Sequence, residues 1–404
     1  MDVPSLKPLF RERRILICVG SGGVGKTTTA ATIALLAALE GRKVLALTID
    51  PARRLADALG LSALGHDIQQ VPDDKLNEVA RLRGTPRQGG GQLFAMMLDQ
   101  KRAFDELVQR YAKNPTLHER ILKNGIYQQI SASLAGSHEY AAMSKLYDLS
   151  REERWDLLVL DTPPTENALD FLSAPDRISE AIDSPALQWF IKPYLQQAGS
   201  WSVRLVGVGG AFVLRGLARF VGSQFLQQMA EFFVEFNDVT AGFRERASAV
   251  RTLLRRPEVA FILVCSPEPL SVDEALYFHG RLLKAEIPLG GIVVNRVNTP
   301  GPELDHELYK TLLERLKTRS EVHGFLLEDL ERLAADLGRT YAEQQVVATS
   351  DRDAIEQIRK KVADSGDKDK PRSALPICQV PMFEHDIYDA PGIALISEHL
   401  SPLD

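Results

Sequence analysis

The feature that most constrains the fold of this chain is a glycine-rich segment near the N-terminus, directly after the apolar run RILICVG. It matches the pattern G-x-x-x-x-G-K-[ST]. Glycines let the backbone adopt positive φ and close on phosphate oxygens, so that N–H groups and the start of the next helix point at the anion. The helical pattern KTTTAATIALLAALEG follows and completes the order strand, loop, helix. The predicted phosphate-binding loop reads Gly20-Ser21-Gly22-Gly23-Val24-Gly25-Lys26-Thr27-Thr28.

Three side chains of this loop carry the expected chemistry. Lys26 adds a positive charge beside the phosphates. Thr27 has the hydroxyl that a Mg²⁺ ion bridging the β- and γ-phosphates needs, and Thr28 can donate to an α-phosphate. ATP and Mg²⁺ are therefore the expected ligands.

The composition is typical of a soluble, cytoplasmic globular enzyme. Of 404 residues, 45% are hydrophobic and 25% charged, and the net charge is −6. Without a long Lys/Arg run, nucleic acid is not an expected partner. Met1–Pro8 contains no apolar segment of a signal peptide, and the weakly charged stretch Leu205–Val221 is interrupted by Arg215 and Arg219. We therefore expect no direct membrane insertion.

Short β-branched runs alternate with helical patterns along the chain, which predicts an α/β fold with a mainly parallel, doubly wound sheet. Their nearly continuous hydrophobicity fits strands that helices cover on both faces. The predicted strands lie at 15–19, 43–49, 155–160, 259–265, 290–295 and 377–380.

The helical patterns also suggest how the chain is divided. Two long intervals, about 91–150 and 177–255, have helical periodicity and no strand signal. We interpret 1–404 as a single nucleotide-binding domain with a helical subdomain inserted at these two places. The polar stretch of about 363–376 is predicted to be a mobile connector.

Two aspartates end predicted strands, where ligands of doubly wound sheets bind. Asp161 could organise the Mg²⁺ shell, and Asp50 could orient or deprotonate the attacking water. The cysteines, Cys18, Cys265 and Cys378, lie inside apolar runs without metal-ligand spacing. Zinc and iron–sulfur sites are therefore not expected.

These motifs resemble the ArsA-type ATPases, a family that includes the arsenite-pump ATPase and the eukaryotic ATPases that target tail-anchored membrane proteins. The resemblance implies a P-loop NTPase fold of the SIMIBI type, ATP hydrolysis and a homodimer whose two nucleotides face each other. The similar segments, from residue 14 to about 385, are GSGGVGKTTT, DPARRLADALG, DTPPTENAL, SPEPLSVDEA, VVNRV and QVPMF.

The resemblance also implies roles for single residues. Asp50 would activate water, Asp161 would lie near Mg²⁺, and Glu268 would lie at the nucleotide edge. The residues implied around adenine are Asn295, Pro381 and Met382.

The chain departs from the family pattern at several positions. Ser21 stands where members usually carry a lysine that reaches the partner's phosphates. Arg53 and Arg54 follow the Asp50 segment, either as phosphate-contacting cations or as residues of a solvated helix. The Cys-x-x-Cys that ties the targeting dimer through zinc is missing from VNTPGPELDHEL, so dimerisation would be metal-free or the closed state transient.

An apolar stripe in the second helical interval allows two interpretations, ordinary core or a groove for another protein's helix. The stripe comprises Leu217, Phe220, Val221, Phe225, Leu226, Met229, Phe232, Phe233 and Phe236. The groove would also include Met96, Met97, Trp189, Phe190, Trp201 and Phe212, with Arg215, Arg219 and Lys192 on its rim.

Four functions remain possible from sequence. An ATP-driven targeting factor or chaperone for hydrophobic segments is favoured by the resemblance and the insert. An energising subunit of an anion transporter would need soft thiolates to bind arsenite. A regulatory ATPase of the MinD or ParA sort would usually end in a basic amphipathic helix, whereas GIALISEHLSPLD is acidic. A small-molecule kinase would need a lid and a substrate pocket that no segment indicates.

Overall fold

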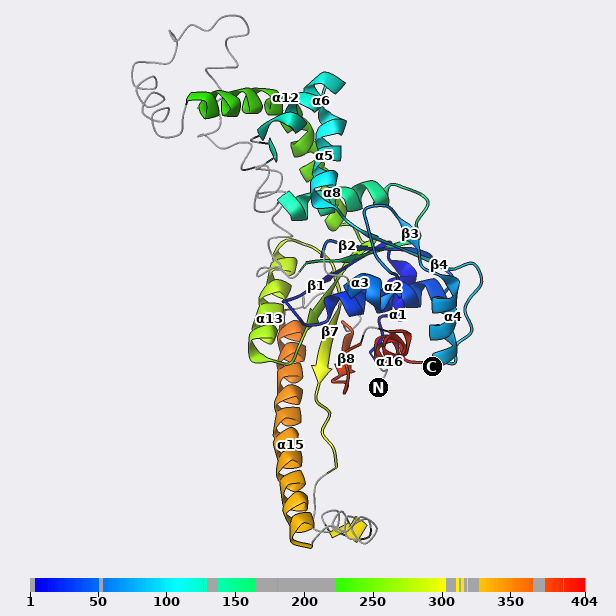
Figure 1. The fold of residues 1–404 in the computed structure, drawn as a ribbon. Helices are drawn as coiled ribbons and strands as arrows, with labels where there is room; N and C mark the ends of the chain where they lie inside the picture. Colours follow the sequence, from blue (N-terminus) through cyan, green and yellow to red (C-terminus); the bar gives the residue numbers. More distant parts are fainter. Residues whose placement is uncertain are drawn as a thin grey trace, which may run out of the picture.

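An eight-stranded sheet with the order β3-β4-β2-β5-β1-β6-β7-β8 forms the centre of the molecule (Figure 1). All strand pairs are parallel except β3 with β4. The strands are β1 (Ile15–Val19), β2 (Lys43–Thr48), β3 (Gln69–Gln70), β4 (Gln92–Met97), β5 (Leu157–Asp161), β6 (Val259–Cys265), β7 (Leu289–Val297) and β8 (Ile377–Pro381). The structure is a computed structural model that describes residues 4–50, 54–125, 127–128, 137–163, 180, 223–302, 310–311, 314–315, 318, 327–365, 375–387 and 389–403.

Helices cover both faces of the sheet, because successive strand side chains alternate between two hydrophobic clusters. In β1, Ile15 and Ile17 belong to one cluster, and Leu16 and Cys18 to the other. The helices that pack against the first face are α5 (Gln100–Tyr111), α6 (Pro115–Lys123), α8 (Ser137–Ser150), α12 (Ser223–Leu254), α13 (Pro269–Lys284) and α15 (Leu327–Asp364). The helices that pack against the second face are α1 (Lys7–Glu12), α2 (Lys26–Leu39), α3 (Arg54–Ala58), α4 (Asp73–Leu82) and α16 (Ala390–Leu400).

The predicted α/β class and doubly wound, mainly parallel sheet are confirmed, and each predicted strand is present within a few residues of its expected bounds. Two strands were missed. The segment QLFAMM, predicted to begin the helical insert, is instead β4, which pairs with β2. Its unbranched residues favour helices in isolation. Burial between β2 and β3 makes it a strand, because strand formation depends mainly on cross-strand neighbours.

Helices α5, α6, α8 and α12 form a layer above the sheet in Figure 1. Asp148 on α8 joins it by pairing with Arg110 of α5 at 2.5 Å and Arg246 of α12 at 2.6 Å. Phe232 on α12 is 2% exposed, and its ring centroid lies 5.2 Å from Phe236. These helices lie within the two predicted helical intervals. A separate inserted subdomain stays a prediction, because residues 164–179 and 181–222 lie outside the described residues.

The proposed groove is wrong at two positions, Met96 and Phe232, which are buried, whereas Met97 is half-buried. Met96 and Met97 belong to β4, where Met96 is 1% exposed, and Phe232 is inside the aromatic core of the helical layer. Met229 is half-buried against the same core, as is Phe236. Side chains that lie outside the described residues are those of Trp189, Phe190, Lys192, Trp201, Phe212, Arg215, Leu217, Arg219, Phe220, Val221, Phe225, Leu226 and Phe233.

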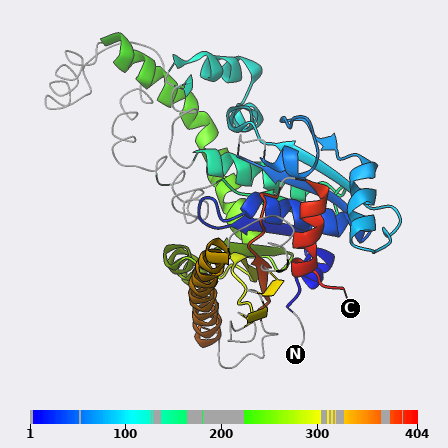
Figure 2. The ribbon, with the colours of Figure 1, turned by 60° about the horizontal axis from the view of Figure 1, so that its bottom comes forward.

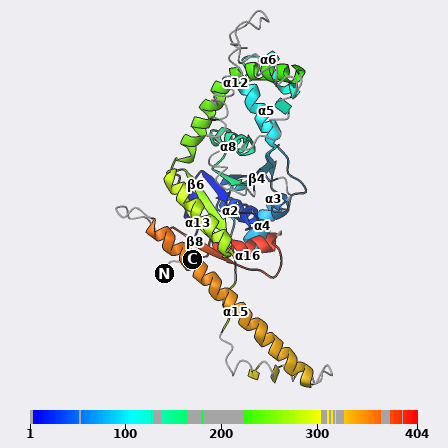
Figure 3. The ribbon, with the colours of Figure 1, turned by 90° about the vertical axis from the view of Figure 1, so that its left-hand side faces the viewer.

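The 38-residue helix α15 extends away from the sheet on the side opposite to α12 (Figures 1 and 3). Its C-terminal part is anchored, because Ile355 and Ile358 enter the core, and it lies beside α13 (Figure 2). The helix continues to Asp364, into the stretch predicted to be a connector, and 366–374 lie outside the described residues. Among the helices described, none has both the length and the apolar character of a membrane span.

A histidine links the loop after α3 to the helical layer. The Asp99 amide donates to His66 Nδ1 at 3.2 Å, and His66 Nε2 lies 3.2 Å from Glu106 Oε1 on α5. Because Nδ1 accepts a hydrogen bond, the neutral ring with its proton on Nε2 fits this site. Burial lowers the pKa of His66, although the Glu106 carboxylate opposes this effect, and Lys145 and Arg102 face the same group.

We predict that His66 makes the fold less stable in mild acid. Its pKa in the folded state lies below the ordinary 6.5, so the unfolded chain binds the proton first as pH falls, and stability is lost through this range. Between pH 7 and pH 5, the melting temperature of His66→Asn should fall by about 1–2 °C less than that of the parent in thermal denaturation. His118→Asn on α6 is the matched control. Equal pH dependence of parent and His66→Asn would contradict the assignment.

Candidate nucleotide site

The phosphate loop connects β1 to α2, and two of its glycines cannot carry a side chain. Gly25 has φ 96° and forms the N-cap of α2, and a Cβ atom there would collide with the Asn295 amide. Gly20 has φ 154°, and a Cβ atom there would collide with the Val264 carbonyl of β6. The loop therefore fits closely against β6 and β7, with the N-terminus of α2 open to an anion.

Lys26 lies across the loop. Its Nζ donates to the Ser21 carbonyl at 2.7 Å, and the residue is 5% exposed. Burial lowers the pKa of Lys26, whereas the charges of Asp161 and Asp50 favour its protonated form. The ammonium group thus donates to a neutral carbonyl within the loop, which a phosphate oxygen could replace.

Asp161 is the buried acid of the site. It is 1% exposed, and its Oδ2 accepts from the hydroxyls of Thr27 at 2.8 Å and Thr48 at 3.0 Å. Its Oδ1 is buried and has no hydrogen-bond partner among the residues that the structure describes. Burial raises the pKa of Asp161 to about 6, although the two hydroxyls oppose the shift. An unpartnered carboxylate oxygen beside the Thr27 hydroxyl fits Mg²⁺, which takes one or two protein oxygen ligands together with phosphate.

Asp50 follows β2 and is joined to Asp161 through one residue. Its amide donates to Thr48 Oγ1 at 3.2 Å, and that same hydroxyl donates to Asp161. Asp50 Oδ2 also lies 3.9 Å from Arg54 Nη1, whose side chain is 64% exposed. Arg53 lies outside the described residues. The structure therefore brings together both predicted acids and one of the two arginines.

Ser21, the residue in place of the family lysine, contacts its own chain. Its Oγ lies 3.3 Å from Ser271 Oγ in the first turn of α13, and Ser271 Oγ accepts from the Ser266 amide at 3.0 Å. Glu268 is the N-cap of α13 and is exposed. Sequence reasoning missed Ser271 and Thr48, because neither residue matches the phosphate-loop pattern or a recognised capping pattern.

The segments implied around adenine converge beside the loop. Asn295 Nδ2 donates to the Val24 carbonyl at 2.9 Å. Pro381 is half-buried at the end of β8, and Met382 is 61% exposed, with its amide donating to the Val297 carbonyl at 3.0 Å. A role of these residues in adenine binding stays a prediction.

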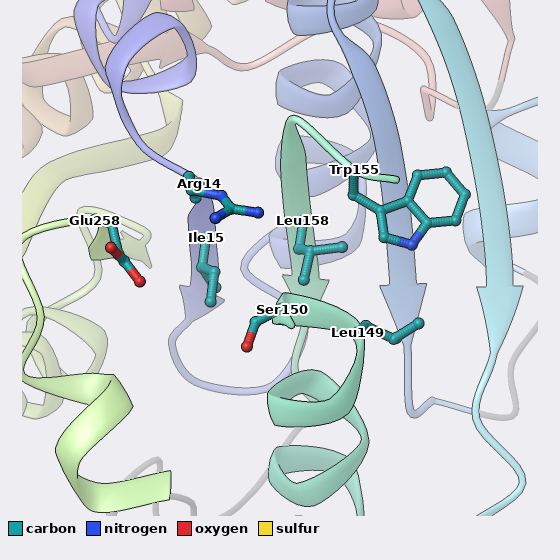
Figure 4. A pocket seen from close by; sticks show the side chains of 7 residues that line it. All are labelled: Arg14, Ile15, Leu149, Ser150, Trp155, Leu158 and Glu258. Carbon is teal, nitrogen blue, oxygen red and sulfur yellow. The ribbon is translucent and has the colours of Figure 1, made fainter. Parts of the chain in front are cut away.

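A small cavity lies at the other end of the strands, away from the phosphate loop (Figure 4). Its volume is about 10 Å³, enough for one water molecule. It is lined by Arg14, Ile15, Leu149, Ser150, Trp155, Leu158 and Glu258. Because Ile15 and Leu158 lie near the starts of their strands, this cavity takes no part in the nucleotide site.

Comparison with known proteins identifies the family. The model of the anion-transporting ATPases of the ArsA type matches residues 13–331. The chain belongs to the ArsA family of ATPases. As a member it is an ATP-hydrolysing, nucleotide-binding enzyme, and its sheet and phosphate loop are those of an α/β P-loop NTPase.

Similar proteins carry GET3 or ASNA1 names. ATPase GET3 of Podospora anserina is 26% identical over 307 residues, covering 75% of this chain and 79% of the relative. ATPase get3 of Neurospora crassa is 25% identical over 333 residues, covering 82% and 85%. ATPase ASNA1 homolog 2 of Paramecium tetraurelia is 27% identical over 305 residues, covering 74% and 78%. The chain is thus a distant relative of these ATPases.

We predict that Asp161→Asn separates stability from metal-dependent binding. The raised pKa shows that the buried charge costs free energy, so the neutral amide should leave the melting temperature of the protein without nucleotide unchanged or higher. Loss of the carboxylate should remove the extra thermal stabilisation that Mg²⁺ gives in the presence of ADP. The matched control is Asp156→Asn, because Asp156 is an exposed aspartate directly before β5. An undiminished Mg²⁺ effect in Asp161→Asn would contradict the metal role.

Proposed function

We propose that this protein is a cytoplasmic, homodimeric ATPase that couples nucleotide-dependent closure to the binding or targeting of hydrophobic segments of membrane proteins. The hydrolytic part is supported by one observation above all, the buried Asp161 with an unpartnered oxygen beside Thr27 of the phosphate loop. The client class is supported by the resemblance to the ATPases that target tail-anchored proteins.

Each residue of the site would have a distinct task in hydrolysis. Lys26 would exchange the Ser21 carbonyl for phosphate oxygens, and the N-terminus of α2 would bind the same anion. Thr27 and Asp161 would hold Mg²⁺, which neutralises charge on the phosphates when it is bound. Asp50, one hydroxyl away from Asp161, would orient the attacking water.

A dimer would explain how the missing loop lysine is replaced. Ser21 contacts Ser271 of its own chain, and its neutral hydroxyl cannot supply the charge of a lysine to a partner. Arg54 lies beside Asp50 with most of its side chain exposed, where a second copy could receive it. Arg53 is the alternative donor. Either guanidinium would stabilise the transferring phosphoryl group.

The cysteines argue against arsenite transport as the purpose of hydrolysis. Cys18, Cys265 and Cys378 are unpaired, buried and located on three different strands, as predicted. Burial raises the pKa of Cys265 and of Cys378 to about 12 and moves that of Cys18 in the same direction. Soft thiolate ligands are therefore not available in the fold. Energising the transport of another anion remains the second candidate, because the matched family model carries that description.

We predict that Asp50→Asn retains ATP binding but hydrolyses ATP about 10²–10⁴-fold more slowly, the usual loss when a general base is removed. Phosphate release gives the rate, and fluorescence titration with a nucleotide analogue gives the affinity. Asp57→Asn, exposed on α3, is the matched control. Turnover of Asp50→Asn at the parental rate would remove Asp50 from the mechanism.

Subunit mixing tests the arginine. An Arg54→Ala subunit paired with an Asp50→Asn subunit contains one site with an intact acid, and this site receives Arg54 only across the interface. Activity should be recovered in the mixture if the arginine acts across the dimer, because such an arginine contributes about 10³–10⁵ to kcat. The same experiment with Arg53→Ala covers the second candidate. Single variants of both arginines that stay within about twofold of the parent would reject the proposal.

We predict that the protein captures an apolar segment of about 20 residues in a nucleotide-dependent manner, because such a segment is costly to expose to water. The client must prefer one nucleotide state, since equal affinity for both would shift nothing. The yield of crosslinking to a tail-anchored segment in ATP, in ADP and without nucleotide measures how capture depends on the nucleotide state. Phe225→Asp should reduce capture by about tenfold, with Gln228→Asp, exposed on the same helix, as the control. Phe232 is unsuitable as a probe because it is buried.

Capture by the parent in no nucleotide state would reject the hydrophobic client. ATPase stimulation by an oxyanion in that case would favour the transport alternative. Undiminished capture by folded Phe225→Asp would reject the proposed surface.

A further inference from the structure

The end of β7 contacts three elements within four residues. Asn295 donates to the Val24 carbonyl in the phosphate loop at 2.9 Å. The Val297 carbonyl accepts from the Met382 amide after β8 at 3.0 Å. Asn298 donates to Asp351 Oδ2 on α15 through its backbone N–H at 2.7 Å and its Nδ2 at 2.9 Å. One short segment therefore connects the phosphate loop, the chain after β8 and the long helix.

A break in the β7 ladder makes these contacts possible. The register with β8 shifts between Val294 and Val297, and Arg296 has φ 62°, in the left-handed region that non-glycine residues seldom occupy. A bulge of this kind redirects the side chains on either side of it. Such a conformation persists only where its surroundings hold it in place. The contacts on both sides of Arg296, at Asn295 and Asn298, can supply this constraint.

Asp351 is an unusual residue for a buried position on a long helix. It is 7% exposed and lies one turn before Ile355, which is in the core. A carboxylate so buried is costly unless it accepts strong hydrogen bonds. Both N–H groups of Asn298 point at the same carboxylate oxygen, which gives charge-assisted bonds. The carboxylate thus holds the end of β7 against the C-terminal part of α15 around residues 351–358, which we call the base of α15.

We propose that Asp351 is a positioning residue for the nucleotide site, through which the base of α15 holds the Asn295–Asn298 segment against the phosphate loop. This role depends on the nucleotide site proposed above and goes beyond it, since no part of Asp351 contacts that loop directly. Coupling of this kind is reciprocal. Nucleotide binding must therefore stabilise the contact between Asp351 and Asn298 by the same free energy by which that contact stabilises the bound nucleotide.

The test is Asp351→Ala in the full-length protein, with Mg²⁺ and ADP as the probe. The Kd for ADP and the KM for ATP should each rise about tenfold, a loss that fits two hydrogen bonds to a charged acceptor. The kcat should stay within about threefold, because Asp50 and Asp161 are untouched. Asp351→Asn, which keeps an acceptor oxygen, should restore most of the affinity. Asp353→Ala, exposed on the same helix, is the matched control.

Hydrogen exchange supplies a readout that a purely structural role would not change. ADP should slow amide exchange in α15 around residue 351 in the parent and not in Asp351→Ala. Should Asp351→Ala fail to fold, Asn298→Ala keeps the backbone bond and should raise the Kd for ADP by about threefold.

Folded Asp351→Ala that binds ADP within about twofold of the parent would overturn the positioning role and leave the nucleotide site intact. Equal weakening by Asp353→Ala would also overturn it. A parent that binds no ADP would reject the nucleotide site itself.

Discussion

The site depends on a carboxylate buried where three chain segments meet. Asp161 ends β5, and its Oδ2 accepts from Thr27 at the start of α2 and from Thr48 at the end of β2. Burial raises the pKa of this group from 3.8 to about 6, so the ionised form costs free energy while its Oδ1 has no partner in the described part of the chain. A bound cation would remove that cost. If Asp161 holds Mg²⁺ as proposed, the parallel sheet would supply part of the affinity for the ion by its geometry.

The sheet topology explains why so few residues suffice. Parallel strands end at the same edge, so the segments that follow β1 and β2 and the last residue of β5 bring Lys26, Asp50 and Asp161 together. Neighbouring β6 and β7 close the other side, where Val264 and Asn295 leave no room for a side chain at Gly20 and Gly25. Because the backbone is packed this tightly, a displacement of one strand end strains the contacts of the neighbouring strand ends.

Two helical structures leave the sheet in opposite directions (Figure 1), and polar contacts help to hold each of them in place. On one side, His66 and Glu106 join the loop after α3 to α5, and Asp148 joins α5, α8 and α12. On the other side, Asp351 joins α15 to the end of β7. These contacts involve partly or fully buried charges. Their stabilising free energy is lost if either partner moves away.

The sequence alone determined the phosphate loop, six of the eight strands, the two acids at strand ends and the family. Each of these follows from a local signal, a glycine pattern or an apolar run that ends in a carboxylate, and local signals survive without knowledge of neighbours. The tertiary structure alone decided that QLFAMM is a strand and that Phe232 belongs to the core rather than to a groove. It also decided that Ser21 contacts Ser271 and that Asp351 binds Asn298, 53 residues away. The physical reason is that burial and long-range hydrogen bonding depend on which segments are packed together, and no short stretch of sequence contains that information.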